Sequence, residues 1–151
     1  MLTALQKLFQ QPNLKSSQKN SINEVMLLCG IMIEAAAIDG TVYQNEILKI
    51  KTSLVSVFHE KYEEVEEAIS SCLDKINEPN SLHYFTSKLN KFFDNNKKII
   101  LLEVLWVIVL ADKKIHDFES NFIRRLAGLL YISNVDCANI KRKVLIKHKL
   151  V

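Results

Sequence analysis

Two pairs of acidic residues are the side chains best suited to bind a cation. Asp39 and Glu46 lie seven residues apart, and Asp112 and Glu119 repeat this spacing. Carboxylate oxygens are the ligands that calcium, magnesium and manganese prefer, and zinc also accepts them. His116 lies between the members of the second pair and could add an imidazole nitrogen. The sequence therefore predicts a candidate divalent-cation site formed by these five residues, for calcium, magnesium, manganese or zinc.

The same residues also suit a purely structural role at helix ends. A carboxylate near a helix N-terminus is stabilised by about 0.3–1 kcal/mol, and Glu46 and Glu119 are expected at such positions. A single turn histidine such as His116 is more often a surface residue than a ligand. Each turn alone supplies too few ligands, so a cation would need both turns, or water, to complete its shell. Structural cap and cation ligand stay open as alternatives.

The pattern D-G-x-V-x-x-x-E is similar to the second half of a calcium-binding EF-hand loop. Positions 1 and 3 of such a loop must supply oxygen ligands. They fall on Ala35 and Ala37 in the first half of the chain and on Ile108 and Leu110 in the second. These residues are apolar and are expected to be helical, which excludes a standard EF-hand but not another kind of cation site.

Other catalytic motifs are absent from the sequence. It has no Gly-rich phosphate loop, no G-x-S-x-G element, no H-E-x-x-H pair and no zinc-binding spacing of cysteine and histidine. We therefore expect a non-enzymatic protein, with a metal-assisted hydrolase as the alternative. Cys29, Cys72 and Cys137 form no C-x-x-C pair, which favours a reducing compartment over a disulfide framework. The chain opens without a signal-peptide pattern, so a cytoplasmic location is expected.

The acidic pairs belong to an internal repeat with a period of 73 residues. In each half an apolar helix ends at the aspartate, an apolar residue follows in the turn, and the glutamate lies one turn into the next helix. The matched positions are Asp39 and Asp112, Val42 and Ile115, Glu46 and Glu119, and Ile50 and Ile123. Gly40 permits a left-handed backbone in the first turn. Lys113 takes its place in the second, so the second turn is expected to differ in shape.

The elements that carry these residues are all predicted to be helices. The 151 residues include only three glycines and two prolines, and they show no period-2 strand pattern. A short helix and linker over residues 1–20 precede a helical domain over 21–151. Expected helices cover about 21–38, 41–58, 61–75, 81–93, 95–111, 118–131 and a last segment after 133. Their predicted caps are Ser21 with Glu24, Thr41 with Gln44, Asp94, and Ser133 with Asp136. The expected fold is an all-α, single-domain bundle of two helix–turn–helix halves.

The apolar helices before the two acidic turns each contain one carboxylate, Glu34 or Glu103. Both apolar runs are shorter than the roughly 20 residues of a membrane span, and they indicate buried central helices. A buried carboxylate needs a partner. We expect an ion pair with Arg124 or Arg125, and an acidic pocket between the two central helices is the alternative. Trp106 is expected in the core.

The C-terminal segment is basic. Residues 141–151 contain no acid, and their cations are Lys141, Arg142, Lys143, Lys147 and Lys149. Such a segment can bind nucleic acid or an anionic membrane surface. The alternative is a solvated helix face whose cations favour the C-terminal end of the helix dipole.

Three stretches of sequence carry a resemblance to a known family. Leu82–Asn90 reads LHYFTSKLN, Leu101–Leu130 reads LLEVLWVIVLADKKIHDFESNFIRRLAGLL, and Ala37–Glu46 matches A-x-D-G-x-(I/V)-x-x-x-E. Together they resemble the signature of the TerB-like (tellurite-resistance protein B-like) family over roughly residues 20–145. The resemblance implies an all-α bundle of about seven or eight helices, and a role in tellurite resistance or stress response. It also implies that the paired acidic positions are metal or partner sites.

The sequence departs from the family pattern near the second acidic pair. Lys113 replaces a glycine, and Ser120 and Asn121 stand where an acidic residue and a histidine are common. The expected function is a non-enzymatic binding or scaffold module with a protein partner. A membrane or nucleic-acid adaptor acting through the basic C-terminal segment is a further alternative.

Overall fold

Every regular element that the structure describes is a helix. The computed structural model describes residues 24–76, 82–110 and 117–148, and these residues contain no strand. A helix over residues 24–36 continues into the 3-10 turn η1 (Ala37–Asp39). The α-helices that follow are α2 (Gln44–Ser56), α3 (Tyr62–Asp74), α4 (Leu82–Phe92), α5 (Asn95–Val109), α6 (Asp117–Leu129) and α7 (Asn134–Lys147). The predicted all-α fold class is confirmed.

Two of the predicted helix caps are confirmed. The Asp94 carboxylate accepts a hydrogen bond from the Lys97 N–H at 2.8 Å, at the start of α5. The Ser133 hydroxyl accepts one from the Asp136 N–H at 3.1 Å, at the start of α7. Each bond satisfies one of the first backbone N–H groups, which have no partner inside the helix.

The residues predicted to cap the start of α2 are wrong. The sequence suggested Thr41 with Gln44, but the cap residue is Tyr43, whose backbone is extended. The Tyr43 N–H donates to Oε1 of Glu46 at 2.9 Å, which is the return bond of a capping box. The predicted N-terminal helix, the domain boundary at residue 20 and the Ser21 cap lie outside the described residues.

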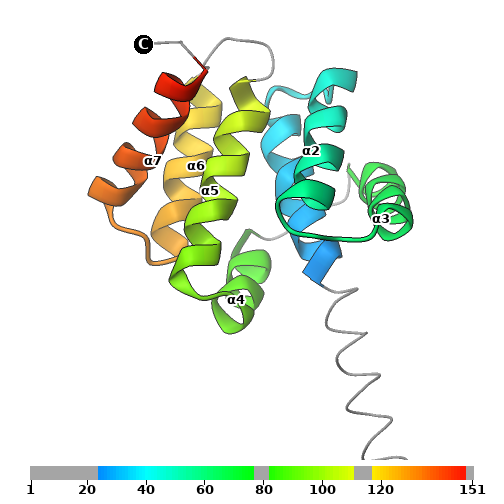
Figure 1. The fold of residues 1–151 in the computed structure, drawn as a ribbon, viewed down its shortest axis with the longest axis horizontal. Coiled ribbons are helices and arrows are strands. Elements are labelled where there is room, and N and C mark those ends of the chain that lie inside the picture. Colours follow the sequence, from blue (N-terminus) through cyan, green and yellow to red (C-terminus); the bar gives the residue numbers. More distant parts are fainter. Residues whose placement is uncertain (1–23, 77–81, 111–116, 149–151) are drawn as a thin grey trace, which may run out of the picture.

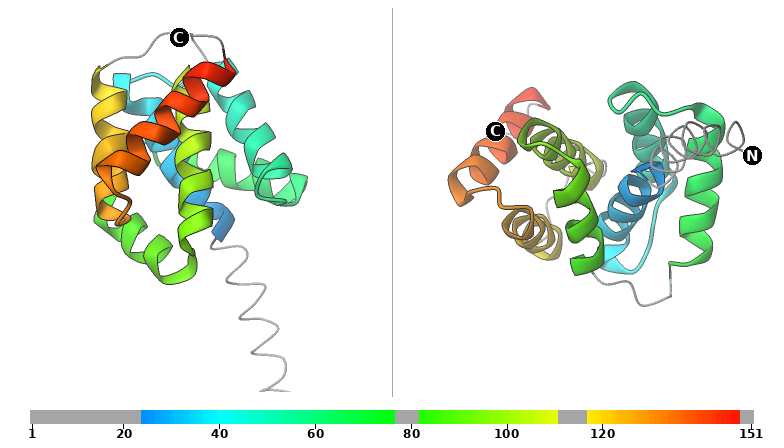
Figure 2. Two further views of the ribbon diagram at one scale, coloured as in Figure 1. Left: turned by 60° about the vertical axis from the view of Figure 1, so that its left-hand side comes forward. Right: turned by 90° about the horizontal axis from the view of Figure 1, so that it is seen from below.

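The two halves of the repeat pack side by side. Figure 1 shows α2 and α3 with helix 24–36 on one side, and α5, α6 and α7 on the other. Contacts between the halves include those of α2 with α5 and of η1 with α6. Helix α4 packs against α6 and lies across the opposite end of the bundle from the N-termini of α2 and α6 (Figures 1 and 2).

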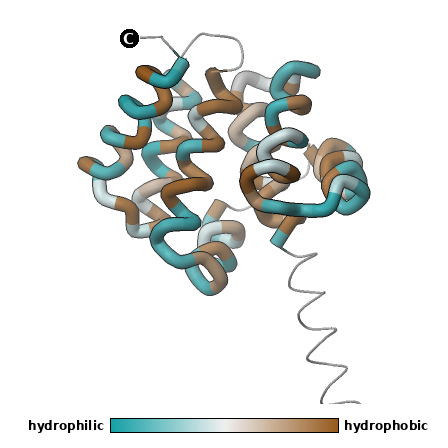
Figure 3. The backbone as a smooth tube through the Cα atoms, in the orientation of Figure 1, coloured by the Kyte–Doolittle hydropathy of each residue, from teal (hydrophilic) through white to brown (hydrophobic). Residues whose placement is uncertain are grey.

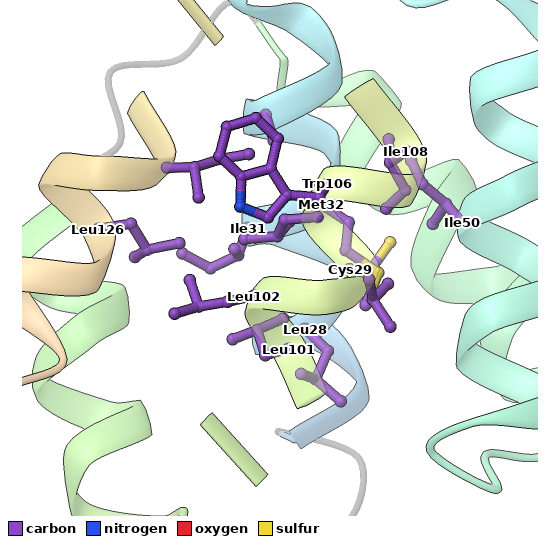
Figure 4. Close-up of a cluster of buried hydrophobic side chains, with 14 of the residues drawn as sticks. Leu28, Cys29, Ile31, Met32, Ile50, Leu101, Leu102, Trp106, Ile108 and Leu126 are labelled. Atoms are coloured by element: carbon purple, nitrogen blue, oxygen red, sulfur yellow. The ribbon is translucent and has the colours of Figure 1, made fainter. Parts of the chain in front are cut away.

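The core is built around helix 24–36 and α5, the two apolar helices that the sequence places at the centre. Figure 4 shows their buried side chains meeting α2 and α6. Trp106 is 2% exposed and is part of this core, as predicted. Figure 3 shows the long apolar stretch of α5 beside the mixed surface of α7. None of the described helices combines the length and the apolar character needed to cross a membrane.

The internal repeat has a structural counterpart. Helix 24–36 and α5 run toward the same end of the bundle, and α2 and α6 return from it (Figures 1 and 2). Glu46 is the third residue of α2, and Glu119 is the third residue of α6. Ile50 and Ile123, four residues further on, are both fully buried. The pattern repeat seen in the sequence is therefore a repeat of helix direction and of core positions.

Candidate cation site

The first acidic turn is shaped by Gly40. This residue has φ +95°, and its N–H donates to the Ala37 carbonyl at 2.8 Å, which closes η1 at Asp39. The left-handed backbone predicted for Gly40 is confirmed. Such a φ disfavours residues with a Cβ. The side chain of Asp39 lies outside what the structure describes.

Glu46 is buried at the start of α2. Its residue is 8% exposed, and Oε1 holds the Tyr43 N–H as described above. The Glu46 N–H in turn donates to Oδ1 of Asn45 at 3.0 Å. The predicted capping role of Glu46 is therefore observed. A carboxylate has about four lone-pair sites, so a cap bond and a cation are compatible on the same side chain.

Glu119 is buried at the start of α6. It is 5% exposed, whereas its neighbour Phe118 is 72% exposed. Asp117, in the same first turn, is also exposed. The helix N-terminus favours negative charge at both acidic positions. Only Glu119 points into the protein, which distinguishes it from an ordinary surface carboxylate in the first turn of a helix.

The packing brings the two acidic turns to the same end of the bundle. η1, which ends at Asp39, packs against α6, which carries Glu119. Helix α2, which carries Glu46, packs against α5, which leads to the second turn. The N-termini of α2 and α6 lie at this end in both views (Figures 1 and 2). The turn that ends at Asp39 therefore contacts the helix that carries Glu119.

The remaining predicted ligands lie outside the described residues. Asp112 and His116 belong to the undescribed segment 111–116, as does Lys113. In the described part of the chain, no group of three or more His, Cys, Asp or Glu side chains is placed to hold a metal ion. The cation site stays a prediction. The excluded EF-hand positions are helical, since Ala35 lies in helix 24–36 and Ile108 in α5.

The two central carboxylates have separate surroundings. Glu103 accepts from Nζ of Lys143 in α7 at 2.9 Å. The predicted ion pair is therefore present for Glu103, but Arg124 and Arg125 are the wrong partners, because α7 lies beside this face of α5. Glu34 lines a different cavity, whose lining does not include Glu103. The alternative of a shared acidic pocket between the central helices is thus not what the described residues form.

Two cations of the basic C-terminal segment contact α5. Lys143 pairs with Glu103 as above, and Nζ of Lys141 lies 5.2 Å from the centre of the Trp106 ring. A cation at this distance from an aromatic face is attracted to it. Arg142 and Lys147 are exposed on α7. Part of the basic character of this segment therefore serves the packing of α7 on α5.

Sequence reasoning missed a cavity of about 450 Å³ between helix 24–36, the end of α3, and α4. A Cβ added to Gly30 would lie 2.8 Å from Cε1 of Phe85, so the glycine lets the α4 ring approach closely. The available sequence signal was a glycine inside an otherwise apolar helix, which often marks close packing. The partner on α4 could not be identified from the sequence.

Sequence reasoning also missed a charged cluster near the start of helix 24–36. Glu24 pairs with Lys97 of α5. Burial raises the pKa of Glu60, in the loop before α3, to about 7, and the carboxylates of Glu24 and Glu64 add to this, while Lys97 opposes it. These charges come from helix 24–36, from α5 and from α3 with its preceding loop. They therefore come together only in the folded chain.

The fold and the acidic turns define a class: an all-α protein built from two helix–turn–helix halves whose Glu-bearing helices start at one end. A family model described as "Tellurite resistance protein TerB" matches residues 25–142, from helix 24–36 into α7. The chain belongs to the TerB family, and the resemblance found in the sequence is confirmed. No curated protein and no solved structure matches the chain.

Proposed function

We propose that this chain is a non-enzymatic binding module that holds one divalent cation between its two acidic turns and presents the loaded end to a protein partner. The observation that carries the proposal is the packing of η1 against α6. It sets the turn ending at Asp39 beside the helix that carries Glu119. A single cation can then take ligands from both halves, which answers the shortage of ligands in either turn alone.

The donor chemistry supports a hard divalent cation. Glu46 and Glu119 are buried carboxylates, and Asp39 and Asp112 would add two more. Calcium, magnesium and manganese favour such oxygen-rich sets, whereas His116 as a ligand would favour zinc. Helix N-termini favour anionic side chains. One divalent cation would offset two of the four negative charges and leave the loaded end anionic.

Exposed apolar side chains at the same end support a protein partner. Ile38 in η1, Tyr43 before α2 and Phe118 in α6 are exposed, and each is next to one of the acidic turns. Exposed apolar residues grouped around polar groups are typical of interaction surfaces. The partner that we expect is a basic protein surface with apolar side chains at its centre.

The description of the matching family suggests the cellular context. We expect the module to act in tellurite resistance or another stress response. Cells without the gene should lose survival on tellurite, and the wild-type chain should restore it. A chain with Asp112→Asn and Glu119→Gln should fail to restore it while accumulating to the same level.

Cation binding can be tested on the chelator-treated protein. Melting temperature would be followed with calcium, magnesium, manganese and zinc. A ligand at 100 times its dissociation constant stabilises the folded state by about 2.7 kcal/mol. The Asp112→Asn/Glu119→Gln variant should lose this stabilisation. Asp117→Asn is the matched control, because Asp117 is an exposed acid in the same first turn of α6. Stabilisation by none of the four cations would refute the cation part of the proposal.

The alternative functions have less support. An adaptor acting through the basic C-terminal segment is weakened because Lys141 and Lys143 contact α5 residues. A metal-assisted hydrolase would need a substrate-sized cleft beside the cation. The described cavity is lined instead by residues of helix 24–36, the end of α3 and α4, none of which belongs to an acidic turn.

A further inference from the structure

The cavity beside Gly30 has a cysteine thiol in its wall. Cys72 of α3 lines it. The rest of the lining mixes apolar side chains with charged ones, among them Met26, Ile33 and Phe85 and the charged Glu34, Lys75 and Lys88. At about 450 Å³ it lies within the usual range of 300–1,000 Å³ for sites that bind small molecules. An apolar molecule that enters this cavity therefore comes within reach of a thiol.

A second thiol lies directly behind the first. The side chains of Cys29, in helix 24–36, and Cys72, in α3, interact with each other, so the two thiols are neighbours in the folded chain. Cys29 is fully buried in the core cluster (Figure 4). Cys72 is only partly buried. The pair thus has an accessible member that faces the cavity and a protected member within reach of it.

The surroundings make Cys72 the nucleophile of the pair. The hydrogen bond with Cys29 lowers the pKa of Cys72, and the positive charge of Lys75 adds to this, while burial and Glu34 oppose it. The same hydrogen bond, together with burial, raises the pKa of Cys29. The thiolate is the reactive form of cysteine. Cys72 is therefore the more acidic thiol of the pair and also the more accessible one.

We propose that Cys72 is a peroxide-reactive thiol, that an apolar organic hydroperoxide reaches it through the cavity, and that Cys29 resolves the product into a Cys29–Cys72 disulfide. This site is separate from the acidic turns and does not depend on a bound cation. It is formed by helix 24–36, α3 and α4, whereas the acidic turns lie where η1 meets α6.

The chemistry balances in two steps. The Cys72 thiolate attacks the terminal oxygen of the hydroperoxide, so that an S–O bond forms as the O–O bond breaks. The alkoxide leaves, takes a proton from water and becomes an alcohol, and the sulfur is oxidised to a sulfenic acid. The Cys29 sulfur then attacks the Cys72 sulfur. An S–S bond forms as the S–O bond breaks, and the hydroxide leaves with the Cys29 proton as water.

Cys137 provides an internal control in the same chain. It is a buried thiol in α7, and burial raises its pKa, against the charges of Arg124 and Lys141. It does not line the cavity. A nonselective oxidant should oxidise Cys72 and Cys137 at similar rates. The proposed site predicts that Cys72 is oxidised faster than Cys137.

The first experiment uses the unmodified full-length protein. It would be treated with less than one equivalent of cumene hydroperoxide, quenched in denaturant with an alkylating reagent, and mapped by mass spectrometry. We expect a Cys29–Cys72 disulfide, with Cys137 alkylated. Cys72 should be consumed at least about tenfold faster than Cys137, as expected for a thiolate against a buried thiol. Equal consumption of the two thiols, or no Cys29–Cys72 disulfide, would overturn the proposal.

Variants and a second oxidant test the resolving thiol and the cavity separately. In Cys29→Ala, dimedone should trap the sulfenic acid on Cys72, and Cys137→Ala should behave like the wild type. Rates with cumene hydroperoxide and with hydrogen peroxide would each be divided by the rate for N-acetylcysteine. The cavity should give the apolar oxidant an advantage of about tenfold, because its ring is buried. Equal normalised rates would refute the cavity as the route.

Discussion

Each half of this protein contains a helix pair, helix 24–36 with α2 or α5 with α6. The halves differ in how tightly the third helix, α3 or α7, packs against its pair. In the second half, α5, α6 and α7 all contact one another. In the first half, α3 packs against α2, and a cavity remains between α3, helix 24–36 and α4. The repeat period of 73 matches Ile33 with Trp106 and Gly30 with Glu103. The second half therefore has a large ring and an ion pair where the first has a smaller side chain and a glycine.

This difference separates the fold from its specialised regions. The shared helix pair sets the direction of α2 and α6 and the burial of Glu46 and Glu119. The third helices give each half its own feature. The first half has a cavity with the Cys29–Cys72 pair, and the second has α7 fixed to α5 through Trp106. The packing that the two halves share therefore supports the two buried glutamates, while the third helices differ between the halves.

The largest expected effect concerns Trp106 and its counterpart Ile33. Trp106→Ala should lower the free energy of unfolding by about 3–5 kcal/mol, because it empties a filled core position. Ile33→Ala should lower it by about 2 kcal/mol, because one side of Ile33 already faces a cavity. Urea unfolding of both variants measures the difference. Equal losses of unfolding free energy in the two variants would contradict the proposal that the core position is filled in the second half and borders a cavity in the first.

The next effect concerns the close approach at Gly30. Gly30→Ala should destabilise the protein by about 1–3 kcal/mol, because the new Cβ would collide with the ring of Phe85. The control is Gly128→Ala in α6, where a Cβ would meet nothing within 4 Å. That change should stabilise the helix by about 0.5–1 kcal/mol. Stabilisation by both substitutions would show that the ring moves freely into the cavity.

The smallest effect concerns Glu60, whose repeat counterpart is the α7 cap Ser133. The pKa of Glu60 is raised from 4.5 to about 7 in the folded state, so the folded chain binds more protons between these values. The contribution of Glu60 to stability is therefore fully present below about pH 4.5 and is lost as pH rises to about 7. Solvent around the half-exposed carboxylate limits the loss to about 1 kcal/mol. Glu60→Gln should remove this part of the pH dependence in thermal unfolding, and an unchanged profile would contradict it.

The sequence predicted best what depends on neighbouring residues. Asp94 and Ser133 were identified because a cap and its N–H lie three residues apart. The start of α2 was missed because Thr41 with Gln44 and Tyr43 with Glu46 have the same spacing, and only the extended backbone at Tyr43 decides between them.

Features that join distant segments were not predictable from local patterns. The partner of Glu103 depends on how α7 crosses α5, so Lys143 could not be chosen over Arg124 or Arg125. The Cys29–Cys72 contact joins residues that are 43 apart in the chain. Of the candidate cation site, the spacing of the acidic residues and the position of both glutamates at helix starts were predicted, whereas the burial of the glutamates was not. The packing of η1 on α6, the helix that carries Glu119, joins residues far apart in the chain and could not be anticipated.

The central claim, one cation shared by both acidic turns, is tested most directly by calorimetric titration of the chelator-treated protein with calcium and manganese. We expect one cation per chain, with binding lost in Glu46→Gln and also lost in Glu119→Gln. Glutamine at position 46 can still accept from the Tyr43 N–H, so the first variant removes charge while keeping the cap. Two cations per chain, or undiminished binding when either turn is changed alone, would contradict the shared site.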